Sequence, residues 1–267
     1  MRILLFGDLV GIPQLLRHIP TSFIAGVVGA AIRPSALKPL AELAESADLR
    51  FLIQPKWKSS EYKLFLDDVA DLSVDLLWSH SYSMIIRDDV LSAARLGGLN
   101  IHHSLLPMYR GPNPTQWSIL DQKHETGVTL HEIDSELDAG PIVDQHEVAI
   151  FIGDTWLDVA ERLELATDDL LRKNVPKVLA ESWISTPQNN AEVTVGQRRR
   201  PEDGEFNWSE SVIDIHNKIR ALIPPLPPAY YLSSREGKTE ITKYQTPWQV
   251  TIAKYAPERR GGGRYAG

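Results

Sequence analysis

The stretch Asn100-Ile101-His102-His103-Ser104-Leu105-Leu106-Pro107 decides the fold, because an apolar run that starts at Leu96 enters it as a strand and ends in polar residues. Asn100 and His102 are two positions apart, so both side chains lie on the same face of an extended strand. Asp138 follows in the glycine-bounded turn Leu137-Asp138-Ala139-Gly140-Pro141. A loop can bring this carboxylate against the imidazole of His102, which predicts one catalytic cleft.

These residue types suit acyl-group chemistry. The amide of Asn100 donates N–H dipoles, which stabilise the oxyanion that forms when a nucleophile attacks a carbonyl carbon. His102 can give or accept a proton, because an unperturbed imidazole has a pKa of roughly 6.5. The carboxylate of Asp138 can orient the imidazole, raise its basicity or hold a relaying water. No nucleophilic side chain is needed when the substrate carries its own amine.

Simpler explanations exist for each residue taken alone. A histidine at a strand end is more often structural, and an aspartate before Ala-Gly is more often a turn former. A metal site is a further alternative, from the set His102, His103, His131, Glu132, Asp134 and Glu136. Adjacent residues on a strand point to opposite faces and make a poor chelate, so we expect no metal.

Further motifs accompany the three residues: Tyr109-Arg110-Gly111 and Thr126-Gly127-Val128-Thr129-Leu130-His131. In order and spacing, the set resembles the formyltransferases that use 10-formyltetrahydrofolate, a family that includes glycinamide ribonucleotide transformylase, methionyl-tRNA formyltransferase and the nucleotide-sugar N-formyltransferases. The catalytic Asn, His and Asp of that family match Asn100, His102 and Asp138. His103 departs from the pattern, since many members have Pro or Gly there.

The resemblance continues in the C-terminal region and covers about residues 1–245. It rests there on Arg198-Arg199-Arg200-Pro201-Glu202-Asp203-Gly204, Asn207-Trp208 and His216-Asn217-Lys218-Ile219-Arg220-Ala221. The sugar-nucleotide branch is the most similar. The resemblance implies transfer of a formyl group from N10-formyltetrahydrofolate to the amine of a nucleotide-linked amino sugar, as in the synthesis of surface polysaccharides such as lipopolysaccharide O-antigen.

The same resemblance implies binding residues for the folate. The pterin would lie in an apolar slot near Met84, Ile85, Ile86 and Leu105, with backbone contacts from the loop 134–138, which contains Asp134 and Leu137. Core packing is the alternative for the apolar side chains.

Acceptor contacts are expected close to the catalytic strand. His131 matches a second histidine near the active site of the purine branch, with a buried structural histidine as the alternative. The other candidates are His103, Arg110, Asn113 and Trp117. Arg110, Asn113 and Trp117 follow the strand closely enough to touch the amino substrate or its phosphates, or else they shape the entry of a helix.

Short apolar runs alternate with amphipathic stretches, which is typical of a Rossmann-like, parallel-rich sheet covered by helices. We expect strands over residues 2–6, 23–31, 51–54, 74–79, 98–102, 127–132 and 141–148. Helices are expected over 37–47, 61–71, 88–94, 114–120 and 155–174. The first glycine-containing loop has only Gly7 and Gly11 and lacks the G-x-G-x-x-G turn, which argues against NAD.

A polar stretch over 186–197 predicts a linker between a catalytic domain, 1–185, and a small C-terminal domain, 198–267. The second domain should hold a helix near 212–222 and strands over 229–232, 240–243 and 249–253. This indicates a β-rich module, either a reduced OB-like unit or a hairpin, and a disordered tail over 259–267. A small β unit needs a partner surface, so we expect a homodimer.

Composition narrows the class of protein. The 267 residues are 43% hydrophobic, contain no cysteine and show no apolar run long enough for a membrane span, so a cytoplasmic globular enzyme is expected. The net charge of −7 argues against a nucleic-acid partner, although residues from Arg198 onward carry 12 Lys and Arg against 8 Asp and Glu. Methionyl-tRNA or another amine acceptor remains an alternative, as does a non-catalytic binding module.

Overall fold

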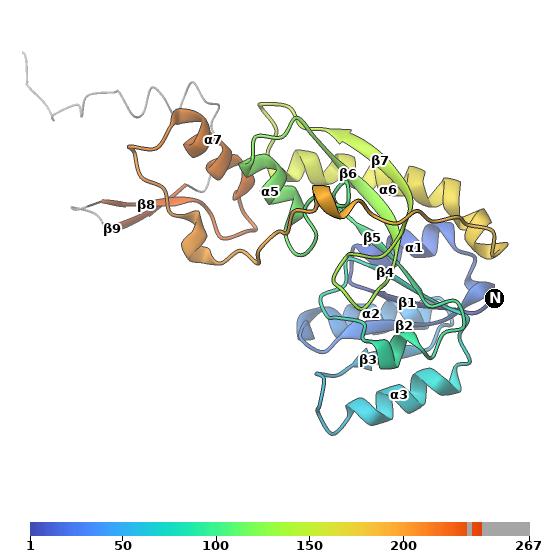
Figure 1. The fold of residues 1–267 in the computed structure, drawn as a ribbon. Coiled ribbons are helices and arrows are strands. Elements are labelled where there is room, and N and C mark those ends of the chain that lie inside the picture. The colour runs from blue at the N-terminus through green and yellow to red at the C-terminus, as the bar shows by residue number, and fades with distance from the viewer. Residues whose placement is uncertain (234–236, 242–267) are drawn as a thin grey trace, which may run out of the picture.

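A seven-stranded sheet forms the core of the N-terminal part of the molecule, as can be followed in Figure 1. The computed structural model describes residues 1–233 and 237–241. The strand order is β3-β2-β1-β4-β5-β6-β7, and the first five strands in this order run parallel. The last two are antiparallel to their neighbours. The strands are β1 Ile3–Gly7, β2 Ile24–Ala30, β3 Phe51–Gln54, β4 Leu76–His80, β5 Gly98–His102, β6 Glu125–Glu132 and β7 Ile142–Ala149.

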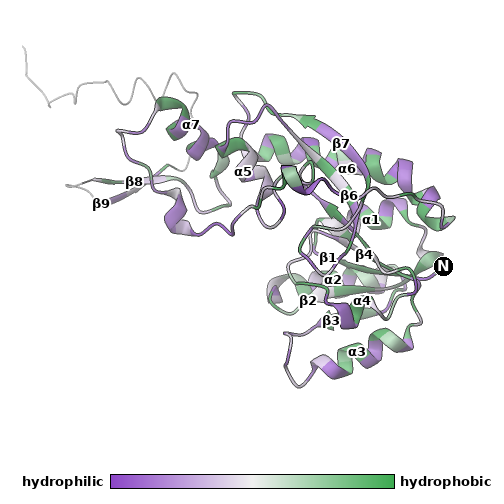
Figure 2. Cartoon of the chain, viewed as in Figure 1, coloured by the Kyte–Doolittle hydropathy of each residue, from purple (hydrophilic) through white to green (hydrophobic). Residues whose placement is uncertain are grey.

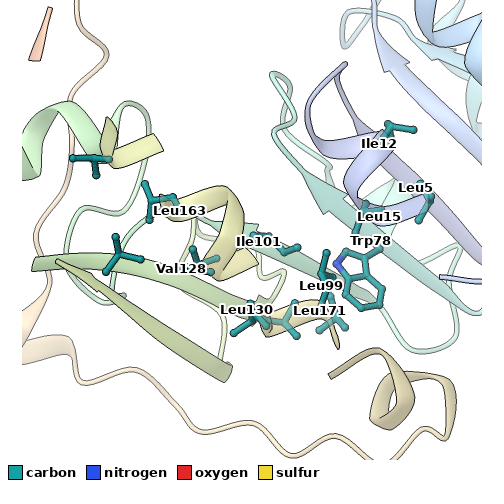
Figure 3. Packing of buried hydrophobic residues seen from close by; sticks show 14 of the residues in the cluster. Leu5, Ile12, Leu15, Trp78, Leu99, Ile101, Val128, Leu130, Leu163 and Leu171 are labelled. Atoms are coloured by element: carbon teal, nitrogen blue, oxygen red, sulfur yellow. The ribbon is translucent and has the colours of Figure 1, made fainter. Parts of the chain in front are cut away.

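Helices cover the two faces of this sheet unequally. Because strand residues alternate in direction, Ile3 and Leu5 join one hydrophobic cluster, and Leu4 and Phe6 join another. The first cluster, part of which Figure 3 shows, includes side chains of α1 Gly11–His18, α2 Pro34–Ser46 and α6 Trp156–Leu179. The second includes side chains of α3 Tyr62–Asp71 and α4 Asp88–Leu91. Hydrophobic and hydrophilic residues alternate along α3 and α6 in Figure 2, as expected of helices with one buried side.

The alternation on β5 leaves two polar side chains on the face away from α6. Leu99 and Ile101 belong to the first cluster, so Asn100 and His102 point to the opposite side. On that side α3 packs on β3 and contacts α4, and Leu91 of α4 lies near Gly98 at the start of β5, whereas loops rather than a helix meet the polar end of β5. The fold therefore leaves room for a site over β5 and β6.

The C-terminal region packs on one end of the catalytic core. It contains α7 Val212–Ala221 and a hairpin of β8 Tyr230–Ser233 and β9 Gly237–Glu240. Side chains of α7 join the first cluster, and α7 lies beside α5 Pro114–Leu120. Nη1 of Arg220 donates hydrogen bonds to the carbonyls of Phe151 and Asp154, just before α6. Short 3₁₀ turns occur at Thr21–Phe23, Asn190–Glu192 and Pro201–Gly204.

The predicted α/β core with a parallel-rich sheet and a small C-terminal hairpin is confirmed, with differences in single elements. Helix α1 was not predicted, because the sequence Gly11-Ile12-Pro13 reads as a loop. Proline is accepted in the first turn of a helix, where its missing N–H has no partner to lose. The strand predicted at 240–243 overlaps β9, Gly237–Glu240, which begins earlier because it pairs with β8, while residues 242–243 lie outside the described residues. The strand predicted at 249–253 and the tail 259–267 lie outside the described residues.

Helix α6 is longer than predicted. It runs on from 174 to Leu179 and keeps Pro176 in its final turn. Its start matches the prediction, since Thr155 is the N-cap and forms a capping box with Asp158. Among the described residues, no helix is both long enough and apolar enough to cross a membrane.

Candidate active site

The site begins with a cross-strand pair on β5 and β6. Asn100 lies opposite His131 in the antiparallel register, and its Nδ2 donates to Nε2 of His131 over 3.0 Å. Nδ1 of His131 therefore carries the ring proton and donates to the carbonyl of Glu132 over 2.7 Å. Burial lowers the pKa of His131 well below its ordinary value, although Asp138 acts in the opposite direction. His131 is thus a neutral imidazole that orients Asn100.

His102 is held from the other side by the loop that follows β5. Its Nε2 donates to the carbonyl oxygen of Tyr109 over 2.8 Å. This leaves Nδ1, which lies 3.6 Å from Oδ2 of Asp138. The side chains of His102 and Asp138 are 9% and 11% exposed, so both are sheltered and still reachable. A proton taken up at Nδ1 would face the carboxylate directly.

Asp138 joins the cluster through an unusual backbone conformation. Its φ is +52°, in the left-handed region that only a few residue types, Asp among them, adopt without a large cost. Oδ2 accepts a hydrogen bond from the backbone N–H of Gly111 over 2.8 Å. Oδ1 lies 3.5 Å from Nδ2 of Asn100 and 3.7 Å from Nε2 of His131. The structure therefore brings all three residues of the predicted trio together.

Gln188, which no sequence signal indicated, supports this loop. Its Nε2 donates to the carbonyls of Asp138 over 2.9 Å and of Gly140 over 2.7 Å. Its Oε1 accepts from the guanidinium of Arg110 over 2.7 and 2.9 Å. The residue lies in the stretch predicted as a linker, and only the three-dimensional contacts reveal that it fixes the backbone that follows the Asp138 side chain, on either side of Ala139.

The three acceptor candidates that follow β5 all contact residues of the segment 188–199. Arg110 is only 8% exposed and is held by Gln188. Oδ1 of Asn113 accepts from the backbone N–H of Arg199, whose guanidinium lies over the ring of Trp117 at 5.2 Å. Nε1 of Trp117 donates to the carbonyl of Gln197. In this structure they anchor residues 188–199 beside the site.

The folate candidates fall into separate groups. Ile86 is buried in the second hydrophobic cluster, Met84 is half-buried, and Ile85 is 64% exposed. Leu105 lies instead against Gly127 of β6. On the loop 134–138, Asp134 and Leu137 are both exposed. Beside Leu105 is an open hollow of about 600 Å³, whose lining includes Glu125, Glu147, Glu192 and His146.

His103 does not join the site. It follows His102 on the opposite side of the sheet, where its ring meets that of His80 edge-on at 5.4 Å and its Nε2 lies 3.4 Å from Oγ1 of Thr167. Burial lowers the pKa of His103 to about 4. It therefore carries no charge near neutral pH that could act on His102 beside it.

The chemistry available to this site follows from its polar groups. An amide N–H, an imidazole with one free nitrogen and a sheltered carboxylate meet at the polar end of a central strand, with no serine or cysteine nucleophile in the cluster. This arrangement suits a transferase that passes a small acyl group directly between two bound partners.

A family model described as formyl transferase matches residues 28–175, and one described as formyl transferase, C-terminal domain, matches 198–254. The chain belongs to the formyl transferase family and is a transferase enzyme.

Solved structures share the fold. A sugar N-formyltransferase from Shewanella sp. is 22% identical, with a TM-score of 0.74 over 91% of this chain and 97% of that one. The N-formyltransferase from Helicobacter canadensis, described in complex with folinic acid and dTDP-3-aminofucose, is 22% identical, with a TM-score of 0.64 over 82% and 80%. Methionyl-tRNA formyltransferase from Clostridium thermocellum is 18% identical, with a TM-score of 0.59 over 90% and 91%.

Proposed function

We propose that this enzyme transfers the formyl group of N10-formyltetrahydrofolate to the amine of a nucleotide-linked amino sugar. The observation that carries the proposal is the convergence of Asn100, His102 and Asp138 in one sheltered cluster, within a chain that belongs to the formyl transferase family. The products would be an N-formyl sugar nucleotide and tetrahydrofolate.

In the proposed reaction the neutral amine of the sugar attacks the formyl carbon. A C–N bond forms, and the carbonyl becomes an oxyanion that accepts hydrogen bonds from Nδ2 of Asn100 and from protonated Nδ1 of His102. The bond from the formyl carbon to N10 then breaks, and a proton from the former amine replaces the formyl group on N10. Asp138, 3.6 Å from Nδ1 of His102, stabilises the imidazolium and relays the proton.

The two substrates would approach over the loops that surround this cluster. We assign the folate to the side of Met84, Ile85 and Leu137, whose partly or fully exposed side chains can cover a pterin ring. The acceptor would lie toward the segment 188–199, where Trp117 and Arg199 form a cation–π pair. The structure of the Helicobacter canadensis relative, described with folinic acid and an amino-sugar nucleotide, supports this choice of partners.

Methionyl-tRNA is the runner-up acceptor, favoured by the likeness to the Clostridium thermocellum enzyme. Charge argues against it. The chain has a net charge of −7, and the hollow beside Leu105 is lined by Glu125, Glu147 and Glu192. A protein that grips tRNA must neutralise several phosphates, which an acidic surface opposes.

The test is a transfer assay with purified protein. N10-formyltetrahydrofolate is incubated with a panel of amino-sugar nucleotides, and tetrahydrofolate release and product mass are followed. We expect one nucleotide sugar to gain one formyl group. His102→Asn and Asp138→Asn should lower turnover by about 10²–10⁴-fold, because each removes a proton-transfer group. His124→Asn and Asp169→Asn, at exposed positions, are the matched controls and should turn over like the unaltered enzyme.

Two results would refute the proposed acceptor. Formylation of charged methionyl-tRNA, with no transfer to any sugar, would assign the enzyme to the tRNA branch. Folate binding without transfer to either acceptor would favour a binding module. Full activity of His102→Asn and Asp138→Asn would instead overturn the assigned catalytic roles.

A further inference from the structure

A second cluster of ligand-type side chains lies on the face of the sheet opposite the candidate active site. His80 ends β4 and belongs to the same face as Leu76 and Trp78, which join the first hydrophobic cluster. His103 follows β5 two residues after Ile101, which also faces that cluster. Glu164 and Thr167, one turn apart on α6, lie over these strand ends. Polar groups thus occupy positions that the rest of this face fills with apolar residues.

These groups are close enough to share one ion. One donor atom from each of His80, His103 and Glu164 can be chosen so that all three lie within 4.8 Å of one another. Ligands on a tetrahedral zinc ion are about 3.4 Å apart, given bond lengths near 2.0–2.1 Å. Glu164 has a flexible side chain on a half-buried position of α6, so a small rotation can close the remaining gap.

The protein itself does not supply hydrogen-bond partners, within its described residues, for all the polar atoms of this cluster. His80 is fully buried, and its Nε2 contacts Oε1 of Gln14 at 2.9 Å, whereas its Nδ1 makes no hydrogen bond of ordinary geometry, although the backbone of Ile101 lies near the ring. Among the residues that the structure describes, the carboxylate of Glu164 forms neither a hydrogen bond nor an ion pair, and the nearby Arg17 and His18 are bound to Asp168 instead. A buried nitrogen without a hydrogen-bond partner, such as Nδ1 of His80, lowers the free energy of unfolding. A further group bound between this nitrogen and the carboxylate of Glu164 would remove that cost.

We propose that His80, His103 and Glu164 bind a zinc ion. Two neutral imidazoles and one carboxylate are a ligand set that zinc accepts, with a water in the fourth position. Gln14 would act as a supporting residue, since its amide joins His80 to the carbonyl of Glu164. The ion would tie α1 and α6 to the ends of β4 and β5, one residue from His102, as a structural clamp behind the active site.

The alternative is an ordinary buried polar cluster that takes no metal. The proposal does not depend on which acceptor the enzyme formylates, and its test needs no substrate. Purified protein is stripped with a chelator, reloaded with Zn²⁺ and exchanged into metal-free buffer, and the metal-to-protein ratio is measured by mass spectrometry. We expect one tightly bound zinc per chain and a higher Tm for the loaded protein.

Variants and spectroscopy separate this site from the catalytic histidines. His103→Asn and Glu164→Gln should each weaken zinc binding by at least about tenfold, the scale on which even supporting groups act. His102→Asn and His131→Asn should keep the ion. Co²⁺ should give visible bands typical of four-coordination in the unaltered protein, and X-ray absorption on the zinc-loaded form should count two imidazoles even if a variant folds poorly. Loss of zinc from His102→Asn but not from His103→Asn, or no stoichiometric zinc in the unaltered protein, would overturn the proposal.

Discussion

At the scale of single residues, the hydrogen bond between Asn100 and His131 fixes where protons lie. His131 accepts through Nε2 and donates through Nδ1, so it is complete as a neutral ring and burial keeps it so. In the proposed mechanism, His102 is therefore the imidazole that carries the developing positive charge. One N–H of Asn100 is used by His131, and the other has only a long contact of 3.5 Å to Asp138. That second N–H is available to an incoming oxyanion.

The first prediction concerns this second N–H. Asn100→Asp keeps the shape of the side chain and removes both donors, so the oxyanion loses a hydrogen bond that exists only in the transition state. We expect kcat to fall by about 10²–10³-fold, with little change in KM for the folate. Steady-state kinetics with the formyl donor and the acceptor found by the transfer assay measure both constants.

Asn207→Asp is the matched control for that substitution. Asn207 is exposed and lies outside the segment 188–199, and its Oδ1 accepts from the backbone N–H of Ser209, which a carboxylate oxygen can also do. Its turnover should equal that of the unaltered enzyme. An Asn100→Asp enzyme of normal kcat would show that the oxyanion is bound elsewhere.

At the scale of elements, the loop between β6 and β7 decides where the carboxylate of Asp138, the proposed catalytic group, lies. Gly140 passes so near β6 that a Cβ there would lie 1.9 Å from the carbonyl oxygen of Glu132. A backbone atom cannot yield as a flexible side chain would. The loop also depends on Gln188, which holds the carbonyls on either side of Ala139.

The second prediction follows from this close approach. Gly140→Ala must push the loop away from β6, which we expect to cost about 1–3 kcal/mol of unfolding free energy. Turnover should fall by about 10²-fold, because a shift near 1 Å is enough to misplace a catalytic group. Denaturant unfolding and the transfer assay measure the two effects.

Gly153→Ala provides the comparison, because a Cβ at Gly153 would meet no atom within 4 Å. It should change neither stability nor turnover appreciably. Equal behaviour of the two alanine variants would mean that the loop relaxes freely and that the position of Asp138 does not depend on Gly140.

These same elements show what the sequence could reveal and what it could not. Strand β5 and helix α5 match their predicted bounds, because their apolar spacing and the proline that starts α5 are local signals. Asn100, His102 and Asp138 were found through motif spacing. Gln188 was not, because its importance comes from contacts with residues about 50 and 78 positions away. His103 was expected at the substrate, although alternation along β5 already points it to the other face.

At the scale of the whole molecule, the two faces of the sheet carry different kinds of side chain. One face carries the proposed catalytic cluster under loops, and the other carries the main hydrophobic cluster with α6. Histidines are buried on both faces and in α7. Burial lowers the pKa of His103 to about 4, and burial together with the charge of Arg220 lowers that of His216 to about 4. In the folded protein the imidazoles of His103 and His216 are therefore both neutral near pH 7.

The last prediction is a loss of stability in mild acid. The unfolded chain binds protons at histidines near pH 6.5, whereas the folded chain does not bind them at His103 and His216 until about pH 4. The unfolded state thus holds more protons in this window, and the free energy of unfolding falls as the pH falls through it. Each such histidine contributes up to about 1.4 kcal/mol per pH unit.

The pH range from 7 to 4.5 separates the effect of the histidines on the free energy of unfolding from that of the carboxylates. Asp144, Asp158 and Asp168 have lowered pKa values, so the stability that they contribute is lost only below the ordinary range near 3.8. Urea unfolding at steps between pH 7 and pH 4.5, in chelator, gives the slope. His216→Asn should reduce the slope by about one proton, whatever it does to stability at pH 7, while His124→Asn, at an exposed position, should leave it unchanged. Equal slopes for all three proteins would mean that His216 takes up its proton in the folded state, and that α7 opens to solvent far more easily than its packing against α5 implies.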